Sequence, residues 1–584
     1  MSLGAPAGLP DQQRPKLVAD SLNVRYPGRR ESALADISMT MPPGEILTVT
    51  GRTGAGKSTL ALALAGFIPR VVRATIGGSL RLGDTALSSA EPGALAGRIG
   101  VVFSTPAHQL SASKRTVREE LAFGLENLGV PRVEMDPRID AVMEQLGIAA
   151  LADREPLTLS GGEQQRVAIA SIVVMGTDVI VLDEPAAQLD PGGTADVGVL
   201  LQRLAADGRV VVCAEQDAGI LGLGRRCLLL DHGRPVALDL PGVTLAPGAL
   251  APYGLRAPAL TVLAFAAGLS PADAFDEGRV TAALSAAAGA GRLATQVPTT
   301  TKALTIADLS PLREVEPASI ELIGLVHRYP GGIDALRGVD LRIEPGEAVA
   351  IVGQNGSGKT TLVKHLNGLL RPDGGAVRVS GNDIRSRLVS DLARQVGFVF
   401  QNPDDQLFER SVEREIGFGA ANMGVSDALR SRLVARAIEA TGLGEQGSSN
   451  PYDLGPSERK LVALASVLAM DPAVLVLDEP TAGQDAPGED RIEAIVRAWN
   501  QTGRSVVAIT HDMEFAGRVF GRIVVMRQGQ VVLDGTPAEV FAPRNEQLLA
   551  STGLRPPPAA RVAAALDLQV VPMDAFELLA ALRT

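Results

Sequence analysis

The stretch Gly353-Gln354-Asn355-Gly356-Ser357-Gly358-Lys359-Thr360-Thr361 follows the apolar run Ala348-Val349-Ala350-Ile351-Val352. It matches the pattern GxxxxGK[ST], in which backbone N–H groups surround a polyphosphate, the lysine reaches the terminal phosphates and the hydroxyl coordinates magnesium. The first half of the chain repeats the arrangement, with Gly51-Arg52-Thr53-Gly54-Ala55-Gly56-Lys57-Ser58-Thr59 after the apolar residues 46–50. Incidental glycine-rich turns would not recur in the same context, so we predict a duplicated ATP-binding unit.

Each half also contains an apolar strand that ends in two acids, Asp183-Glu184 in the first and Asp478-Glu479 in the second. In a P-loop enzyme the first acid holds magnesium and the second polarises the attacking water. Such a pair is often only a solvated turn. Here both pairs follow a P-loop lysine at similar spacing, 126 and 119 residues, which favours the functional interpretation.

A third motif, Leu159-Ser160-Gly161-Gly162-Glu163, lies 23 residues before the first acid pair, counted from Ser160 to Asp183. A serine followed three residues later by glutamate is also an ordinary helix cap. In this order, however, the motif resembles the signature of the ATP-binding cassette (ABC) ATPases. The resemblance implies an α/β fold of tandem P-loop NTPase domains, each a RecA-like three-layer core with a helical subdomain. It also implies that the two cassettes pair head to tail as an intramolecular dimer, with each ATP between one P-loop and the other cassette's signature.

The second copy of the signature departs from this pattern. It reads Leu454-Gly455-Pro456-Ser457-Glu458, again 23 residues ahead of its acid pair, from Gly455 to Asp478. The first-position hydroxyl is lost, and proline has no backbone N–H to donate. We expect this loop to bind a phosphate poorly.

Two further elements of the resemblance also differ between the halves. The strand at 396–400 leads to Gln401, which by resemblance contacts magnesium and the attacking water, whereas its counterpart is Ser104. The strand at 506–510 leads to His511, the position of the family's switch histidine, whereas its counterpart is Gln216. Glutamine donates a hydrogen bond but does not titrate near neutral pH.

Head-to-tail pairing would collect these differences in one of two composite sites. The site on Lys359 would contain Thr360, Gln401, Asp478, Glu479 and His511, and would be completed by Ser160, Gly161 and Gly162. The site on Lys57 would contain Ser58, Asp183 and Glu184 together with Ser104, Gln216 and the altered residues Gly455, Pro456 and Ser457. We therefore predict one active and one degenerate ATP site, with Mg²⁺ held by Thr360, Gln401 and Asp478 in the first and by Ser58 and Asp183 in the second. Independent drift of the halves would have scattered the changes.

Tyr26 and Tyr329 lie about 30 residues ahead of the two P-loop lysines, where members of the family stack an aromatic ring on adenine. The chain has only four tyrosines. We expect these two to stack on adenine rather than to pack in the core.

The branch of the family is indicated by Phe400-Gln401-Asn402-Pro403-Asp404-Asp405-Gln406-Leu407-Phe408 and by Val412-Glu413-Arg414-Glu415-Ile416-Gly417-Phe418-Gly419. These stretches resemble the ATPases of energy-coupling-factor importers and of cobalt and nickel uptake systems. The implied partners are a transmembrane coupling subunit and a small membrane protein that captures a vitamin or metal ion. A fused ATPase of a sugar importer or an efflux system, and a soluble tandem cassette protein acting on ribosomes or DNA, are the alternatives.

The length of 584 residues agrees with a duplication. We expect a first nucleotide-binding domain at 14–245, an appendage and linker at 246–317, a second nucleotide-binding domain at 318–547 and an appendage at 548–584. Residues 283–305, rich in Ala, Gly and Thr, have the composition of a flexible linker.

Composition restricts the location and the partners. No apolar run approaches the roughly 18 residues that span a bilayer, and no basic-then-apolar signal begins the chain. We expect a cytoplasmic protein that reaches the cytoplasmic face of the membrane only through partners. The net charge of -11 argues against nucleic acid as a partner. With two cysteines, Cys213 and Cys227, no disulfide or zinc framework is indicated.

Overall fold

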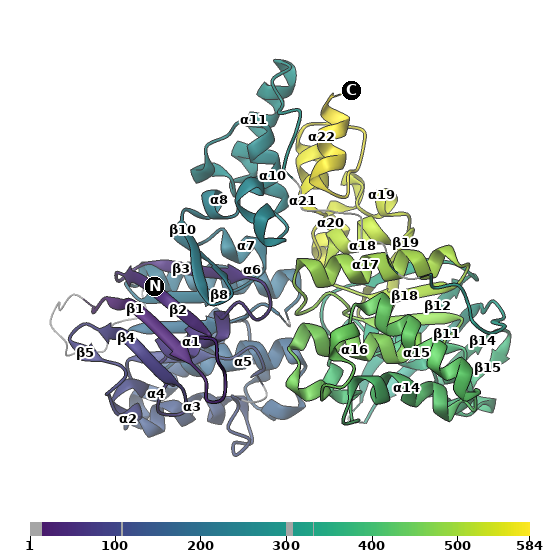
Figure 1. The fold of residues 1–584 in the computed structure, drawn as a ribbon, viewed down its shortest axis with the longest axis horizontal. Coiled ribbons are helices and arrows are strands. Elements are labelled where there is room, and N and C mark those ends of the chain that lie inside the picture. Colours follow the sequence, from purple (N-terminus) through teal and green to yellow (C-terminus); the bar gives the residue numbers. More distant parts are fainter. Residues whose placement is uncertain are drawn as a thin grey trace. The chain divides into compact units, whose positions relative to one another are not determined.

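The computed structural model describes residues 14–106, 109–187, 189–298, 306, 308–330 and 332–583. The chain separates into two compact units, which divide within the segment 281–299. Each unit contains one P-loop cassette with its own sheets and helices (Figure 1).

The first cassette is built on a six-stranded sheet with the order β10-β9-β3-β8-β7-β6. All neighbouring strands are parallel except the edge pair β10 and β9. The central strands are buried along their whole length, as expected for near-continuous apolar runs covered on both faces. The strands are β3 (Ile46–Gly51), β6 (Ile99–Val102), β7 (Val179–Asp183), β8 (Val210–Ala214), β9 (Arg226–Asp231) and β10 (Arg234–Asp239).

A second, antiparallel sheet of the first cassette has the order β2-β1-β4-β5. It shares a hydrophobic core with the first helix and with one face of the six-stranded sheet. These strands are β1 (Leu17–Arg25), β2 (Leu34–Met41), β4 (Thr75–Leu82) and β5 (Thr85–Ala86). The helices are α1 (Lys57–Leu64), α2 (Pro92–Ala96), α3 (Val117–Asn127), α4 (Arg132–Gln145), α5 (Gly161–Val173), α6 (Pro191–Ala206) and α7 (Ala218–Leu221).

The second cassette repeats this topology, with sheets of the order β16-β17-β18-β13-β19-β20 and β12-β11-β14-β15. Its strands are β11 (Ile320–Tyr329), β12 (Ile333–Ile343), β13 (Ala348–Val352), β14 (Gly374–Val379), β15 (Asn382–Asp383), β16 (Val396–Val399), β17 (Val474–Asp478), β18 (Ser505–Ile509), β19 (Arg522–Arg527) and β20 (Gln530–Gly535). Its helices are α12 (Lys359–Leu366), α13 (Val389–Ala393), α14 (Val412–Asn422), α15 (Asp427–Thr441), α16 (Pro456–Leu468), α17 (Ala486–Gln501) and α18 (Met513–Val519).

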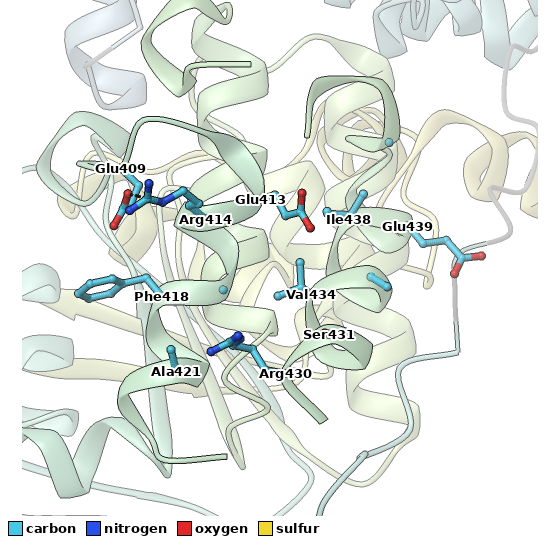
Figure 2. A pocket seen from close by; sticks show the side chains of 13 residues that line it. Glu409, Glu413, Arg414, Phe418, Ala421, Arg430, Ser431, Val434, Ile438 and Glu439 are labelled. Carbon is cyan, nitrogen blue, oxygen red and sulfur yellow. Dashed lines mark ion pairs between the residues drawn. The ribbon is translucent and has the colours of Figure 1, made fainter. Parts of the chain in front are cut away.

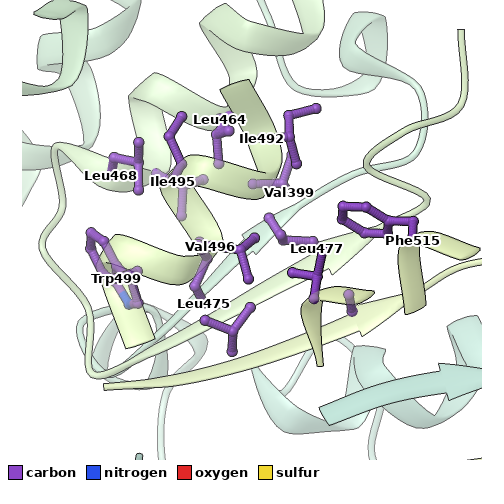
Figure 3. Close-up of a cluster of buried hydrophobic side chains, with 14 of the residues drawn as sticks. Val399, Leu464, Leu468, Leu475, Leu477, Ile492, Ile495, Val496, Trp499 and Phe515 are labelled. Carbon is purple, nitrogen blue, oxygen red and sulfur yellow. The ribbon is translucent and has the colours of Figure 1, made fainter. Parts of the chain in front are cut away.

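Strand β17 shows why the fold has three layers. Successive side chains of a strand point to opposite faces. Leu475 and Leu477 belong to one buried cluster with α16 and α17, which also contains the fully buried Trp499 (Figure 3), whereas Val474 and Val476 pack with α12 and the antiparallel sheet. The sheet is therefore covered on both faces, and the acid pair stands at the carboxyl end of β17. This arrangement confirms the predicted α/β class.

Each cassette is followed by short helices, namely α8 (Pro241–Thr244), α9 (Pro247–Leu250), α10 (Ala259–Ala266) and α11 (Glu277–Gly289) in the first half, and α19 (Pro537–Val540), α20 (Glu546–Ser551), α21 (Pro558–Ala565) and α22 (Ala575–Arg583) in the second. The prediction of a flexible linker from residue 283 was wrong for 283–289, which are helical in α11. Leu284 and Ala287 are buried there, and alanine is the best helix former. Residues 299–305 of that prediction lie outside the described residues.

The segment before the second cassette is fastened to it. Leu309 belongs to the core of the second unit. The N–H of Leu312 donates to Oδ2 of Asp471 at 2.9 Å, and Arg436 and Arg504 donate to the carbonyls of Ser310 and Leu309. We call residues 309–313 the strap. Within the described residues, no helix is both long and apolar enough to cross a membrane.

Candidate active sites

Both P-loops lie between a buried strand and the start of a helix, β3 and α1 in the first cassette and β13 and α12 in the second. The residues before the helices, Gly56 and Gly358, have φ angles of 105° and 101°, which side-chain-bearing residues rarely adopt. A Cβ at Gly358 would lie 2.5 Å from the carbonyl oxygen of Ala335, and one at Gly56 would lie 2.8 Å from that of Ala33. Glycine is therefore required here, and neither helix start is capped by a side chain. The first-turn N–H groups of both helices suit a phosphate.

The two lysines lie inside their loops. Nζ of Lys359 donates to the carbonyls of Gly353 and Gln354 at 2.7 and 3.0 Å. Nζ of Lys57 donates to those of Gly51 and Arg52 at 2.9 and 3.2 Å. Both side chains are buried, so each ammonium is held within its own loop.

Asp478 and Asp183 end their strands in buried positions, and the Oδ1 atom of each has no hydrogen-bond partner. Burial, followed by the charge of Glu479, raises the pKa of Asp478 to about 6. Burial also raises the pKa of Asp183, against the hydroxyl of Ser58 and the charge of Lys57. An orphaned buried carboxylate oxygen fits a cation ligand. Among the described residues no group of three or more His, Cys, Asp or Glu could hold a metal ion by itself. The predicted further ligands of Mg²⁺ are Thr360 and Gln401 beside Asp478, and Ser58 beside Asp183.

Glu479 is paired with His511 in the second cassette. Its Oε2 lies 2.8 Å from Nδ1 of His511 and accepts the N–H of the same residue at 3.2 Å. Burial alone would raise the pKa of Glu479, but His511 and then Lys359 hold that pKa below its usual value. Burial likewise opposes a charged His511, but Glu479 raises the pKa of the imidazole. The histidine thus favours the ionised form of this carboxylate.

The matched carboxylate of the first cassette has a different environment. Burial raises the pKa of Glu184, with Lys57 acting against it, and its switch-position neighbour Gln216 contributes only a hydrogen bond. Glu215, where the second cassette has Thr510, is buried and has a pKa raised to about 8, first by burial and then by Asp217. Gln216, at the position of His511, cannot carry a positive charge.

The two signature loops differ in what their side chains do. Ser160 begins α5 and forms a capping box, in which its N–H and Oγ contact Oε2 of Glu163 at 2.9 and 2.7 Å. Ser160 and Gly161 are exposed, so their outer polar groups remain accessible. Ser457 of the second loop is buried, and its hydroxyl donates to Oε1 of Gln484 at 2.8 Å.

A protein-family model described as ABC transporter matches residues 34–187 and 336–482, the two P-loop cassettes with their acid pairs. The chain belongs to the ABC transporter family. An ABC transporter ATP-binding protein of Methanosarcina acetivorans is 35% identical over 581 residues, covering 97% of this chain and 92% of that protein. Another, from Streptomyces avermitilis, is 35% identical over 561 residues, covering 91% and 97%.

A solved structure, cbiO1 from Clostridium perfringens, is described as part of the ABC transporter complex cbiONQ. It is 34% identical, covers 43% of this chain and 100% of its own, and has a TM-score of 0.37. The family-model match and the Methanosarcina relative confirm the predicted family, fold class and ATPase activity: the chain is an ATP-binding ABC ATPase with tandem cassettes.

Four further predicted residues, Tyr26, Tyr329, Gln401 and Ser104, belong to these ABC cassettes. The hydroxyls of Tyr26 and Tyr329 each lie 3.2 Å from the second threonine of their own P-loop, Thr59 and Thr361. The rings therefore lie close to the loops, and their stacking on adenine stays a prediction. Gln401 follows β16 and is exposed, whereas Ser104 follows β6 and is half-buried.

Sequence reasoning missed two residues of the second ABC cassette, Lys460 and Gln484. Both side chains are buried. Nζ of Lys460 donates to the carbonyl of Glu479, and Gln484 is hydrogen-bonded to Ser457. The available signal was a comparison of the halves: the same offset that aligns Asp478 with Asp183 places Lys460 on Gln165 and Gln484 on Leu189.

The helical subdomain of the second cassette has a groove of about 880 Å³ between α14 and α15 (Figure 2). Its exposed lining residues Glu413 and Glu439 form no ion pair among the described residues, whereas Arg414 is paired with Glu409 at 3.2 Å. Phe418, also exposed, packs edge-to-face on Phe408 with ring centroids 4.6 Å apart.

Proposed function

We propose that this chain is the fused ATPase pair of an energy-coupling-factor importer for a vitamin or metal ion, with hydrolysis at the Lys359 site and a degenerate Lys57 site. The observation that carries the site assignment is the contact of 2.8 Å between Glu479 and His511, which has no ionic counterpart at Glu184 and Gln216. The importer branch is supported by the sequence from Phe400 to Phe408.

At the Lys359 site the chain's own groups divide the work. The N–H groups of the loop Gly353–Thr361 and the Lys359 ammonium hold the phosphates. Thr360, Asp478 and Gln401 would hold Mg²⁺, which supplies positive charge against the phosphate oxygens when bound. Glu479, ionised beside His511, accepts the proton of the attacking water, and His511 donates to the terminal phosphate.

Head-to-tail pairing in an ATP-bound closed form would complete this site with Ser160, Gly161 and Gly162. The Lys57 site would instead meet Gly455, Pro456 and Ser457. Three features should weaken phosphate binding at the Lys57 site. Pro456 lacks an N–H, the hydroxyl of Ser457 already donates to Gln484, and Gln216 carries no charge. Losing one preorganised donor to developing charge costs about 10² to 10³ in rate, although such losses are not additive.

The proposed membrane partners are a transmembrane coupling subunit and a membrane protein that captures the substrate. We place the contact of the coupling subunit at the groove between α14 and α15, whose lining includes the exposed ring of Phe418 and the exposed carboxylates of Glu413 and Glu439 (Figure 2). Phe123, the counterpart of Phe418, is also exposed, but the Nζ of Lys114 lies 5.3 Å from its ring centroid. The chain would thus lie peripherally on the cytoplasmic face of the membrane.

Two experiments test this function. Trapping with vanadate and a photoreactive ATP analogue should label peptides of the second half near Lys359, and equal trapping on both P-loops contradicts the site assignment. Detergent extraction with a tagged full-length chain should recover integral membrane proteins. Recovery of ribosomes, or of a sugar-transport or efflux subunit, contradicts the importer.

A further inference from the structure

Three polar side chains meet at the junction of α16 with the loop that follows β17. Ser457, Lys460 and Gln484 are 6%, 5% and 3% exposed. Their counterparts in the first cassette are Gly162, Gln165 and Leu189, by the offset that aligns the two acid pairs. The altered signature of the second cassette is therefore accompanied by two other changes, one in its own helix and one in the loop behind the acids.

These residues fasten the helix to the loop. The hydroxyl of Ser457 donates to Oε1 of Gln484 at 2.8 Å, and Nε2 of Gln484 donates back to the carbonyl of Ser457 at 3.3 Å. Nζ of Lys460 donates to the carbonyl of Glu479 and, at 3.1 Å, to that of Ala482. Four hydrogen bonds thus join the start of α16 to residues 479–484.

The first cassette lacks this connection in its described residues. Gln165 is 1% exposed, yet neither its Nε2 nor its Oε1 has a hydrogen-bond partner. Leu189 is apolar and Gly162 has no side chain, so neither can form the reciprocal pair made by Ser457 and Gln484. The cluster belongs to the cassette that carries the Glu479–His511 pair.

The hydrogen bond from Lys460 to the carbonyl of Glu479 restrains the backbone at that residue. Glu479 has a φ of 49°, a conformation that persists only where the surroundings impose it. Its N–H is held by the carbonyl of Ile509 at 3.0 Å, and its carbonyl is held by Lys460. Glu184 has a φ of 51°, an N–H held by Ala214 at 2.8 Å and a carbonyl that accepts the N–H of Ala187 at 3.2 Å, as the carbonyl of Glu479 accepts that of Ala482 at 3.3 Å. Among the described residues, only the carbonyl of Glu479 also receives a charged side chain. Lys460 therefore does not create the conformation; it adds a charged donor to the carbonyl of the peptide group that follows Glu479.

A buried ammonium is costly unless hydrogen bonds and opposite charge compensate it. Here the two carbonyls accept from Nζ, and the carboxylates of Asp478 and Glu479 lie near enough to act on the lysine. A glutamine, as in the first cassette, would fill much of the space without carrying the charge.

We propose that Lys460, supported by Ser457 and Gln484, is a positioning residue for Glu479. The altered signature helix then serves hydrolysis in its own cassette instead of binding a phosphate of the other site. This inference rests on the proposed role of Glu479 as the group that activates water.

The test uses full-length chain with its membrane partners or in detergent. Lys460→Gln, which installs the residue of the first cassette, should lower kcat for ATP hydrolysis about tenfold to a hundredfold, because displacements near 1 Å have effects of that order. KM for ATP should change less than about twofold, since the P-loop contacts are untouched. Lys16→Gln removes the same charge at an exposed position and should leave both constants unchanged.

Lys460→Gln in the Glu479→Gln background separates positioning from a general loss of structure. Single-turnover hydrolysis by the double variant should equal that of Glu479→Gln alone, because a residue that acts through Glu479 has nothing left to position. If Lys460→Gln fails to fold, as judged by thermal unfolding, Ser457→Gly with Gln484→Leu provides the second test and should also lower kcat at unchanged KM.

The outcomes are distinguishable. An unchanged kcat in Lys460→Gln, or in the folded Ser457→Gly/Gln484→Leu variant where that is used, with an inactive Glu479→Gln, overturns the positioning role and leaves the site assignment intact. The positioning role is also overturned if Lys460→Gln lowers the hydrolysis rate by the same factor in the Glu479→Gln background as in the unmodified protein. A fully active Glu479→Gln overturns the proposed role of Glu479 and this inference together.

Discussion

Replacing Glu479 with glutamine removes a carboxylate that is 6% exposed and lies 2.8 Å from Nδ1 of His511. The variant keeps the shape of the side chain but cannot accept a proton from water. General-base catalysis contributes about 10² to 10⁴ in rate, so steady-state hydrolysis should fall by at least about a hundredfold. Glu184→Gln makes the same chemical change beside Gln216 and should alter the rate less than about twofold if that site already turns over slowly.

The assay is phosphate release at saturating ATP and Mg²⁺, accompanied by a separate measurement of ATP binding. Both variants should still bind ATP, because Lys57, Lys359 and their loops are unchanged. Comparable losses from Glu479→Gln and Glu184→Gln would refute the asymmetry. A large loss from Glu184→Gln alone would reverse the assignment of the two sites.

Three other changes give measurable outcomes. Asp478→Asn should stabilise the protein against urea in EDTA at pH 7.5. The pKa of Asp478 is raised from 3.8 to about 6 in the folded protein, so ionisation of this group destabilises the fold as the pH rises from 3.8 to 6, by at most about 3 kcal/mol. The gain in free energy of unfolding should therefore be smaller at pH 4.5 than at pH 7.5. A gain that grows toward acid pH would contradict the burial argument. Trp499→Ala should lower the free energy of unfolding by about 3 to 5 kcal/mol, because the fully buried indole fills the core of Figure 3, and a loss below 1 kcal/mol would mean that the core readily collapses around the gap. Asp471→Ala leaves Arg436 and Arg504, which lie 2.9 and 2.7 Å from its Oδ1, buried without their anion, and should cost about 3 to 5 kcal/mol in urea unfolding; an unchanged midpoint would remove the strap's proposed anchor.

Much of the fold was predictable because its determinants are local. The apolar runs before the P-loops and before the acid pairs became central strands, and Lys57 and Lys359 begin helices. Residues 283–289 were mistaken for linker because alanine-rich composition alone does not distinguish a solvated tether from a helix. The burial of Leu284 and Ala287 decides that point, and it depends on neighbours distant in sequence.

The candidate sites show a similar division. The P-loops, the acid pairs and the switch positions were readable as motifs, and the structure brings Lys359, Asp478, Glu479 and His511 together in one cassette. The hydrogen-bond partner of Ser457 could not be predicted from the sequence. Only the folded chain puts its hydroxyl on Gln484 and puts Lys460 on the carbonyl of Glu479. Tertiary hydrogen bonds of this kind leave no periodic trace in a sequence.

The strap at 309–313 affects how the second half can be studied by itself. A recombinant fragment beginning at residue 318 would omit the carbonyls that receive Arg436 and Arg504 and the N–H that caps Asp471. Such a fragment would expose a tightly balanced cluster of charge to water and lose Leu309 from its interior. Fragments of the second half should therefore begin upstream of residue 306. Poor solubility of a shorter fragment would reflect the loss of the strap rather than an inability of the cassette to hydrolyse ATP.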